Sequence, residues 1–224
     1  LNLMLLVHVT EKFDCSSLEV IAYGAEPMSA RLLGRLVKAF PNAAFQQKFG
    51  TSETGAIRIK SQSTDSVYFR IEDSGVEWRV QDAELWLKTS SRILGYLNAD
   101  ESSLEADGWY RTGDLVEEAE GGYLRIIGRR SQLINVGGQK VHPAEVEQVI
   151  AEIEGVEACS VYAKPAAVTG NLVACVIVTS AERDLRSWKR LVRKHCRGRI
   201  ADWKIPASVE LRAELSMTDR LKRG

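Results

Sequence analysis

The sequence predicts a chain that combines α/β and α+β architecture in two successive parts, and three observations lead to this prediction. A strand, a helix and a second strand follow one another over residues 18–49, which is the order of a βαβ unit at a parallel sheet edge. Apolar and polar residues then alternate over residues 67–94, as in a small antiparallel β subdomain. Beyond residue 130, two helical stretches and three strand-like runs predict a small α+β domain of roughly 90 residues.

The composition is that of an ordinary globular chain without a dominant charge. Of its 224 residues, 45% are hydrophobic, 27% are charged, and 30 basic residues balance 30 acidic ones. Such a chain can bury the core of one large or two small domains. The balance gives no net field that would recruit nucleic acid or an anionic membrane. The basic residues gather late, since residues 181–224 hold 13 Lys and Arg against six Asp and Glu.

Cysteine usage and hydropathy predict a cytoplasmic protein without a membrane span. The four cysteines show no CxxC spacing and no histidine at metal-ligand spacing, which favours reduced thiols. No apolar run approaches the ~18 residues of a spanning helix, and residues 1–9 lack a basic leader. Because the chain starts with Leu1 inside a helical pattern, we expect it to be a fragment of a longer protein.

The first part of the chain begins with the strand, helix and strand. Residues 18–23 are a short buried run that the segment Gly24–Pro27 ends. Ser29 is a candidate N-cap for a helix, with apolar residues on one face, that extends to about residue 40. A second strand over residues 44–49 then leads to a loop at the sheet edge, where open α/β sheets bind ligands.

Two runs in the first part carry groups that can do chemistry. Residues 49–55, Phe-Gly-Thr-Ser-Glu-Thr-Gly, place an aromatic ring, hydroxyls and a carboxylate at one strand end. A glycine-rich turn with a helix cap and a solvated glutamate is the alternative interpretation. Residues 107–127 contain four glycines and predict short strands with tight turns. Within them Asp114 lies in a glycine turn, where a carboxylate can accept two hydrogen bonds from vicinal hydroxyls. The same pattern also fits an Asx turn without a ligand.

The second part opens with a strand over residues 122–127, an arginine pair and a Gly137-Gly138 turn, and Pro143 then begins a helix. Glycine tolerates positive φ and close approach, and proline suits the first helical turn. By spacing alone this is a hairpin followed by a helix. The remaining expected elements are a helix at 143–153, strands at 156–162 and 172–179, a helix at 185–197, and a strand at 207–211.

The motifs of this stretch resemble the junction of the adenylate-forming superfamily, which contains acyl- and aryl-CoA ligases, adenylation domains of nonribosomal peptide synthetases and luciferases. The matching residues are Gly128-Arg129, the run Ile134 to Val141, and Pro143-x-Glu145-x-Glu147. The resemblance implies that residues 1–128 are the C-terminal part of the AMP-binding N-terminal domain. Residues 129–224 would then be a small mobile C-terminal domain with a hinge near 128–131. The family's upstream phosphate loop, rich in Ser, Thr and Gly and ending in Lys, has no match in these residues.

The resemblance also implies site residues. A strand end similar to residues 49–55 carries an aromatic that stacks on adenine, a hydroxyl that touches a phosphate and a glutamate that binds Mg²⁺. A Thr-Gly-Asp similar to residues 112–114 grips the AMP ribose, and a lysine on the terminal loop serves adenylation. The implied catalytic residues are Lys222, Ser52 and Glu53, with Glu53 also the metal ligand. The implied cofactor-binding residues are Gly24, Ala25, Glu26, Phe49, Gly50, Asp114, Arg129, Gly137 and Gly138.

Lys222 departs from the family pattern around it, because Leu221 stands where the family has Gly and Ser216 where it usually has Pro. A basic tail solvated by water is the alternative interpretation of this segment. Gly137 and Gly138 would line the path of pantetheine toward the acyl group. Arg129 would accompany Asp114 at the ribose or the phosphate.

The function implied by the resemblance is that of an ATP-dependent acid–thiol ligase. It would form acyl-AMP from a carboxylic acid, ATP and Mg²⁺, and then an acyl thioester, with coenzyme A as the first choice of thiol. The phosphopantetheine of an acyl carrier protein is the second choice, and we expect the 224 residues alone to be inactive. An alternative is a non-catalytic module whose basic stretch Arg186–Arg199 engages nucleic acid or a partner. Since Trp188, Leu191 and Val192 form an ordinary apolar face there, we expect no nucleic acid partner.

Overall fold

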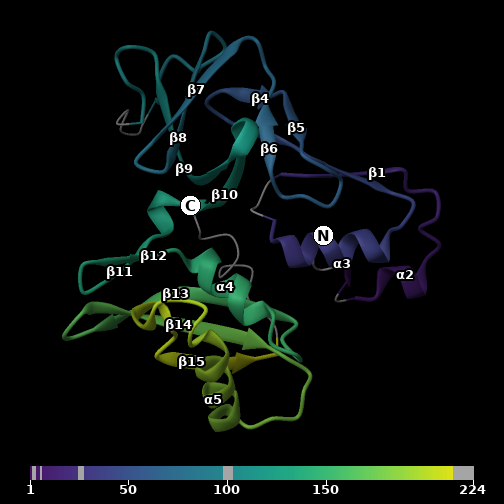
Figure 1. Cartoon of the computed structure of the whole chain (residues 1–224), viewed down its shortest axis with the longest axis vertical. Coiled ribbons are helices and arrows are strands. Elements are labelled where there is room, and N and C mark those ends of the chain that lie inside the picture. The colour runs from purple at the N-terminus through teal and green to yellow at the C-terminus, as the bar shows by residue number, and fades with distance from the viewer. Residues whose placement is uncertain (2–3, 6, 25–27, 98–102, 214–224) are drawn as a thin grey trace. The chain divides into compact units, whose positions relative to one another are not determined.

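The computed structural model describes residues 1, 4–5, 7–24, 28–97 and 103–213 of the chain (Figure 1). It divides into two compact units, Leu1–Ile127 and Gly128–Gly224. The elements from the first unit are α2 (Val9–Lys12), β1 (Val20–Tyr23), α3 (Ala30–Ala39), β2 (Ala44–Gln47), β3 (Phe49–Thr51), β4 (Gly55–Ile57), β5 (Ile59–Ser61), β6 (Phe69–Ile71), β7 (Val76–Gln81), β8 (Glu84–Thr89), β9 (Tyr110–Ala119), the 3-10 turn η1 (Glu120–Gly122) and β10 (Tyr123–Arg129).

The strand, helix and strand predicted for the start of the chain are β1, α3 and β2. β1 and β2 pair in parallel, from Val20 opposite Ala44 to Tyr23 opposite Gln47. α3 begins where predicted, because the Ser29 hydroxyl accepts a hydrogen bond from the amide of Leu32 at 3.1 Å. The helix packs its apolar face into a cluster with both strands. The buried members of that cluster are Ile21, Tyr23, Leu33, Leu36, Phe40, Phe45 and Val67.

The antiparallel part is a six-stranded sheet in the order β5-β6-β10-β9-β8-β7, which confirms the alternation seen over residues 67–94. It differs from expectation between residues 107 and 127, where short strands were predicted. β9 there is a continuous strand of ten residues. Gly113 lies inside β9 with φ of 73°, beside a register shift between Glu84 and Trp86 on β8. The glycine therefore accommodates an irregularity within the strand instead of ending it.

The second unit is an α+β body. Its elements after β10 are the 3-10 turn η2 (Arg130–Gln132), β11 (Ile134–Val136), β12 (Gln139–Val141), α4 (Pro143–Ala151), β13 (Ala158–Ala166), β14 (Gly170–Val178), α5 (Leu185–Cys196), the 3-10 turn η3 (Asp202–Lys204) and β15 (Ser208–Arg212). β13 and β14 pair antiparallel, and β14 and β15 pair in parallel. Together with the first unit, this body confirms the predicted mixture of α/β and α+β structure.

α4 and α5 cover one face of the three-stranded sheet. Val146 and Ile150 of α4 share a buried cluster with Trp188 and Val192 of α5 and with Cys175 of β14. None of these residues belongs to the cluster around α3, so each unit has a core of its own. All four cysteines are free thiols. Across the described ranges, every helix is too short or too polar to span a lipid bilayer.

One glycine at the end of β1 is required by close backbone packing. A Cβ atom on Gly24 would lie 2.0 Å from the carbonyl oxygen of Lys48, whose amide donates to the carbonyl of Tyr23 at 2.6 Å. A side chain at Gly24 would therefore push β1 away from the end of β2. This steric requirement accounts for the glycine whether or not a nucleotide lies beside it.

We predict that Gly24→Ala lowers the free energy of unfolding by about 1–3 kcal/mol, the usual cost of overpacking. Gly34→Ala is the matched control, because a Cβ atom there meets nothing within 4 Å and glycine inside a helix costs stability. The control should raise the free energy of unfolding by about 0.4–1 kcal/mol. Urea unfolding followed by circular dichroism measures both, and equal stability of the two variants would contradict the steric argument.

Candidate active site

The hairpin between β3 and β4 presents the first group of candidate residues. Thr51 and Gly55 pair, so Ser52, Glu53 and Thr54 form a three-residue loop that closes on Gly55 with φ of 73°. The Thr51 hydroxyl accepts hydrogen bonds from the amides of Glu53 at 3.2 Å and Thr54 at 3.1 Å. Ser52 is exposed in this loop. The loop thus displays one hydroxyl to solvent and uses another to fix its own backbone.

Gly50 closes the same hairpin. A Cβ atom at Gly50 would lie 2.5 Å from the carbonyl oxygen of Gly55, so the two strands can meet only if this residue has no side chain. Phe49 beside it is buried and belongs to the core of the antiparallel sheet. Its ring centroid lies 5.4 Å from that of Phe69 at an interplanar angle of 31°. Part of the Phe49 ring is therefore committed to internal packing.

Glu53 is held by a segment far along the chain. The Tyr96 hydroxyl donates to Oε1 of Glu53 at 2.8 Å, and the amide of Ile93 donates to the Glu53 carbonyl at 2.8 Å. The Ser91 hydroxyl donates to the carbonyl of Thr54 at 3.0 Å. Three contacts therefore fasten the hairpin loop to residues 91–96 and orient the carboxylate.

These contacts set the protonation of Glu53. Burial by itself raises the pKa of its carboxyl, but hydrogen bonds from Tyr96, from the Glu53 backbone amide, and from Tyr110 and Thr51 together hold the pKa below its ordinary value. Burial and the adjacent Glu53 charge raise the pKa of Tyr110 above its usual range. At neutral pH the cluster is therefore one carboxylate supported by two neutral phenols, a suitable ligand environment for a hard cation.

Asp114 lies on β9 in the same unit and is 6% exposed. Its amide donates to Oγ1 of Thr112 at 3.0 Å, and that hydroxyl donates to the carbonyl of Leu85 at 2.7 Å. The amide of Gly113 donates to Oε1 of Glu84 at 3.0 Å. Thr112 and the Gly113 amide thus fasten the Thr-Gly-Asp run to β8, which fixes the backbone that carries Asp114.

Glu84, the residue that holds Gly113, is itself only 2% exposed. The Arg111 guanidinium lies 3.6 Å from its second carboxylate oxygen and 5.5 Å from the ring of Trp86. Arg79 lies between Trp86 and Trp109, at 4.6 Å and 4.2 Å from their ring centroids. Cations alternate with aromatic rings on this sheet face and hold β7, β8 and β9 in register.

The candidate residues of the second unit lie around a different hairpin. Gly137 and Gly138 join β11 to β12 with φ of 57° and 89°, the two-residue turn expected between twisted strands. The Gly138 amide donates to Oδ1 of Asn135 at 2.9 Å, and the Gly137 amide donates to the carbonyl of Thr169 at 2.9 Å. A Cβ atom on Gly138 would meet nothing within 4 Å, whereas one on Gly137 would meet the Thr169 side chain at 3.6 Å, so the turn is open at Gly138.

The remaining candidate residues predicted from the sequence either lie apart from these groups or fall outside the described residues. Arg129 is exposed at the end of β10, in the unit that does not contain Asp114. Ala25, Glu26 and Lys222 lie outside the described residues. Tyr96 and Tyr110, which hold Glu53, were not assigned a functional role from sequence. Their contacts with Glu53 join residues more than forty positions apart, and no local pattern signals such a contact.

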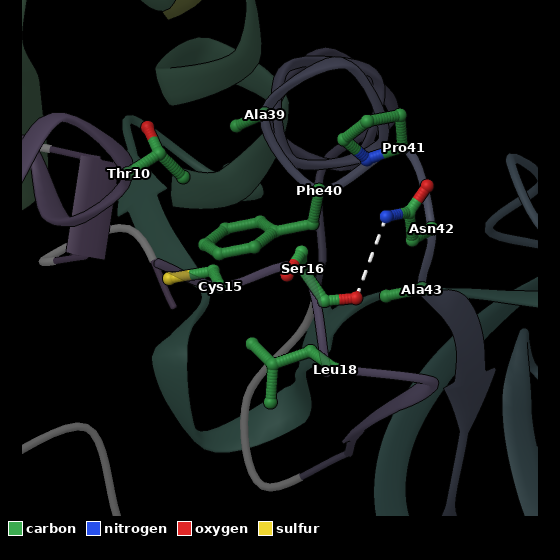
Figure 2. A pocket seen from close by; sticks show the side chains of 9 residues that line it. All are labelled: Thr10, Cys15, Ser16, Leu18, Ala39, Phe40, Pro41, Asn42 and Ala43. Carbon is green, nitrogen blue, oxygen red and sulfur yellow. Dashed lines mark hydrogen bonds between the residues drawn. The ribbon is translucent and has the colours of Figure 1, made fainter. Parts of the chain in front are cut away.

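A pocket of about 200 Å³ lies elsewhere in the first unit, between the ends of α2 and α3. Figure 2 shows the Phe40 ring beside the Cys15 thiol, with the Asn42 side chain donating to the carbonyl of Ser16. None of the candidate site residues lines this pocket. Among the described residues, no group of three or more His, Cys, Asp and Glu side chains is arranged to hold a metal ion.

The fold and these motifs are those of the adenylate-forming superfamily. The family model described as the AMP-binding enzyme C-terminal domain matches residues 145–222. The chain belongs to this superfamily of AMP-dependent synthetases and ligases, and it corresponds to the C-terminal part of its members.

Individual relatives agree with this assignment. A 2-succinylbenzoate–CoA ligase of Listeria monocytogenes is 34% identical over 77% of this chain and 38% of its own length. FadD10 of Mycobacterium tuberculosis, a medium/long-chain-fatty-acid acyl-carrier-protein ligase, is 30% identical over 75% of this chain and 36% of its own. The crystal structure of ATP-bound MatB from Rhodopseudomonas palustris matches with a TM-score of 0.75 and 26% identity, over 88% of this chain and 42% of that one. The chain thus spans about two fifths of the length of such relatives.

We predict that Tyr96→Phe raises the pKa of Glu53 toward its ordinary value, because the largest favourable hydrogen bond to the carboxylate is lost. Because the pKa of Glu53 is lowered in the folded state, this hydrogen bond stabilises the fold at pH values above the ordinary carboxyl pKa. The stabilisation is lost as the pH falls through the pKa of the folded state. The variant should therefore lose less stability in acid than the parent. Carbon-13 NMR titration of the carboxyl reports the pKa directly.

Tyr162→Phe is the matched control. The Tyr162 hydroxyl donates to Glu210 at 2.8 Å and lowers the pKa of that carboxyl in the same way. This substitution should raise the pKa of Glu210 and leave that of Glu53 unchanged. If the pKa of Glu53 were unchanged in the Tyr96→Phe variant, the Tyr96 hydroxyl would not be what lowers that pKa.

Proposed function

We propose that the whole protein activates a carboxylic acid with ATP and transfers the acyl group to a thiol. The observation that carries this proposal is the oriented Glu53 carboxylate at the β3–β4 hairpin, in a unit that also holds Asp114 on a fixed backbone. Membership of the adenylate-forming superfamily supports assigning both groups to AMP and its phosphate. Residues 1–128 would be the end of the AMP-binding domain, and residues 129–224 a mobile C-terminal domain hinged near 128–131.

In this proposal Asp114 accepts hydrogen bonds from both ribose hydroxyls. A carboxylate can accept two such bonds at once, and charge-assisted bonds are stronger than neutral ones. The 7% of Phe49 that remains exposed would contact adenine, together with the segment Gly24-Ala25-Glu26. Ser52 is exposed in its hairpin loop, which suits a hydroxyl that donates to a phosphate oxygen. Arg129 would supply a cation to the ribose or the phosphate.

Glu53 would hold Mg²⁺ when the nucleotide is bound. Mg²⁺ prefers oxygen ligands and commonly keeps waters and substrate phosphates, so one protein carboxylate is sufficient. Because hydrogen bonds lower the pKa of Glu53 against the effect of burial, the carboxylate is ionised at neutral pH. Bound there, the ion would offset negative charge on the phosphates.

The chemistry consists of two displacements. A carboxylate oxygen of the acid attacks the α-phosphorus of ATP, and pyrophosphate leaves to give acyl-AMP. The sulfur of a thiol then attacks the acyl carbonyl, AMP leaves as a phosphate anion, and the thiol proton is released to solvent or a base. Lys222 would stabilise charge that develops in the first step. The open turn at Gly137 and Gly138 would let pantetheine pass close to the backbone in the second.

Coenzyme A is the proposed thiol, in line with relatives that are CoA ligases. A protein-borne phosphopantetheine is the second candidate, which the carrier-protein ligase FadD10 favours. We propose a cytoplasmic location for the whole protein, where ATP and coenzyme A are supplied. The alternative of a non-catalytic module has no comparable support among the relatives.

We predict that Asp114→Ala in the whole enzyme weakens AMP binding by roughly 1.5–3 kcal/mol for each charge-assisted hydrogen bond lost. Calorimetric titration with AMP measures the loss. Asp107→Ala is the control, because Asp107 is exposed and its carboxylate accepts a long hydrogen bond of 3.4 Å from the amide of Trp109. Equal AMP affinity in both variants would show that Asp114 does not bind the ribose.

We further predict that two substitutions separate the half-reactions. Lys222→Ala should slow acyl-AMP formation by about 100-fold or more, the scale of one preorganised electrostatic contact, and should spare thioester formation from supplied acyl-AMP. Gly138→Leu should do the reverse, since its side chain would enter the open space at the turn. Pyrophosphate exchange measures the first step, and thioester release from acyl-AMP measures the second.

A control is needed because Gly138 has φ of 89° and any side chain there strains the turn. Gly198→Leu introduces a comparable strain at φ of 74°, also in open space, and should leave both steps unchanged. If Lys222→Ala and Gly138→Leu slow the same half-reaction equally, the proposed division of labour between the two residues is wrong.

A further inference from the structure

The outer face of α5 carries an uninterrupted stripe of positive charge. We call it the α5 stripe. All of its members are exposed, and among the described residues none of them takes part in an ion pair. Its members are Arg186, Lys189, Arg190, Arg193, Lys194 and Arg197.

The stripe has a rigid base. Trp188, Val192 and Cys196 are spaced four residues apart and are fully buried in the core of the second unit, so they hold the opposite face of the helix against the sheet. The Asp184 side chain caps the first turn by accepting from the amide of Ser187 at 2.8 Å. From Arg186 to Arg197 the stripe is ~16 Å long at 1.5 Å per residue. The charges are thus displayed on a fixed, narrow ridge.

This arrangement is electrostatically unfavourable for the isolated chain. Like charges three and four residues apart on a helix repel one another, and the stripe contains several such pairs. Arg186 also lies in the first turn, where the helix dipole disfavours a cation. Asp184 at the N-cap attracts Arg190, whereas Glu152 pairs with Arg199 and His195 beyond the stripe. An anionic partner would remove this repulsion.

We propose that the α5 stripe is the docking surface for a small acidic protein that carries the acceptor thiol. The inference rests on the proposed function and assigns a docking surface to the carrier of its second candidate acceptor, a protein-borne phosphopantetheine. Four of the six cations are arginines, whose planar guanidinium pairs with carboxylates through two parallel hydrogen bonds. Coenzyme A and a carrier protein present the same pantetheine arm, so the turn at Gly137 and Gly138 would serve either. The similarity to FadD10, named as an acyl-carrier-protein ligase, agrees with this partner.

The shape of the stripe suits a small partner. An acidic protein can cover a narrow ridge of six cations without contacting the rest of the unit. The apolar face of α5 is buried, so the helix has no free face to insert into lipid.

The test measures binding of this chain to an acidic acyl carrier protein in its phosphopantetheine form. The variant Arg190→Glu with Lys194→Glu reverses two charges four residues apart on the stripe. The matched control, Arg31→Glu with Arg35→Glu, makes the same change on exposed positions of α3 in the other unit. We expect the stripe variant to raise Kd by about 10-fold or more, with a weaker dependence on salt, and the control to leave Kd unchanged. Circular dichroism checks that both variants keep their helices.

Three outcomes would overturn the proposal. The stripe variant could bind the carrier protein with an unchanged Kd, the control variant could lose as much affinity as the stripe variant, or the parent chain could fail to bind the carrier protein. Stripe-dependent binding to phosphatidylserine-containing vesicles or to a DNA duplex, without carrier binding, would assign the ridge to that ligand instead. In the whole enzyme, the stripe variant should keep pyrophosphate exchange and thioester formation with free coenzyme A. If the unaltered enzyme shows no exchange, the proposed function fails, while carrier binding still decides the role of the stripe.

Discussion

A buried carboxylate must be hydrogen-bonded, and the first unit depends on how Glu84 meets this requirement. At 2% exposure it has lost almost all contact with water, and it accepts from the Gly113 amide at 3.0 Å with Arg111 beside it. That contact joins β8 to β9 where their register shifts. Because this contact fixes the backbone of Gly113, it also fixes the position of Asp114, the residue after Gly113. A structural carboxylate thereby orients a candidate functional one.

The Glu53 hairpin uses the same physical device with a different result. Here the carboxylate is only partly buried, and phenol donors lower its pKa against the effect of burial. The outcome is an ionised group at the protein surface, held in one orientation by Tyr96. The two glutamates show that burial alone does not decide the role of a carboxylate. The number and geometry of its donors decide whether it fastens strands together or remains available to a ligand.

The two units have separate cores but complementary chemistry in the proposed reaction. The first unit holds the carboxylates that suit a nucleotide and its cation. The second unit holds the glycine turn, which suits the pantetheine thiol, and the α5 stripe, which suits an acidic carrier protein. Because each unit buries its own apolar cluster, neither unit depends on the other to complete its core. Such independence is a physical precondition for a domain that serves two steps in turn.

The sequence by itself determined the local elements and the superfamily. The Ser29 cap, the Pro143 helix start and the Gly137-Gly138 turn depend on neighbouring residues only, so patterns of a few residues predict them. Contacts between distant residues were decided by the tertiary structure. Tyr96 meets Glu53 across 43 positions, and Gly113 lies inside a long strand because Glu84 on another strand holds it there. Sequence patterns carry no record of which distant donors reach a carboxylate, since that depends on the register and packing of the folded sheet.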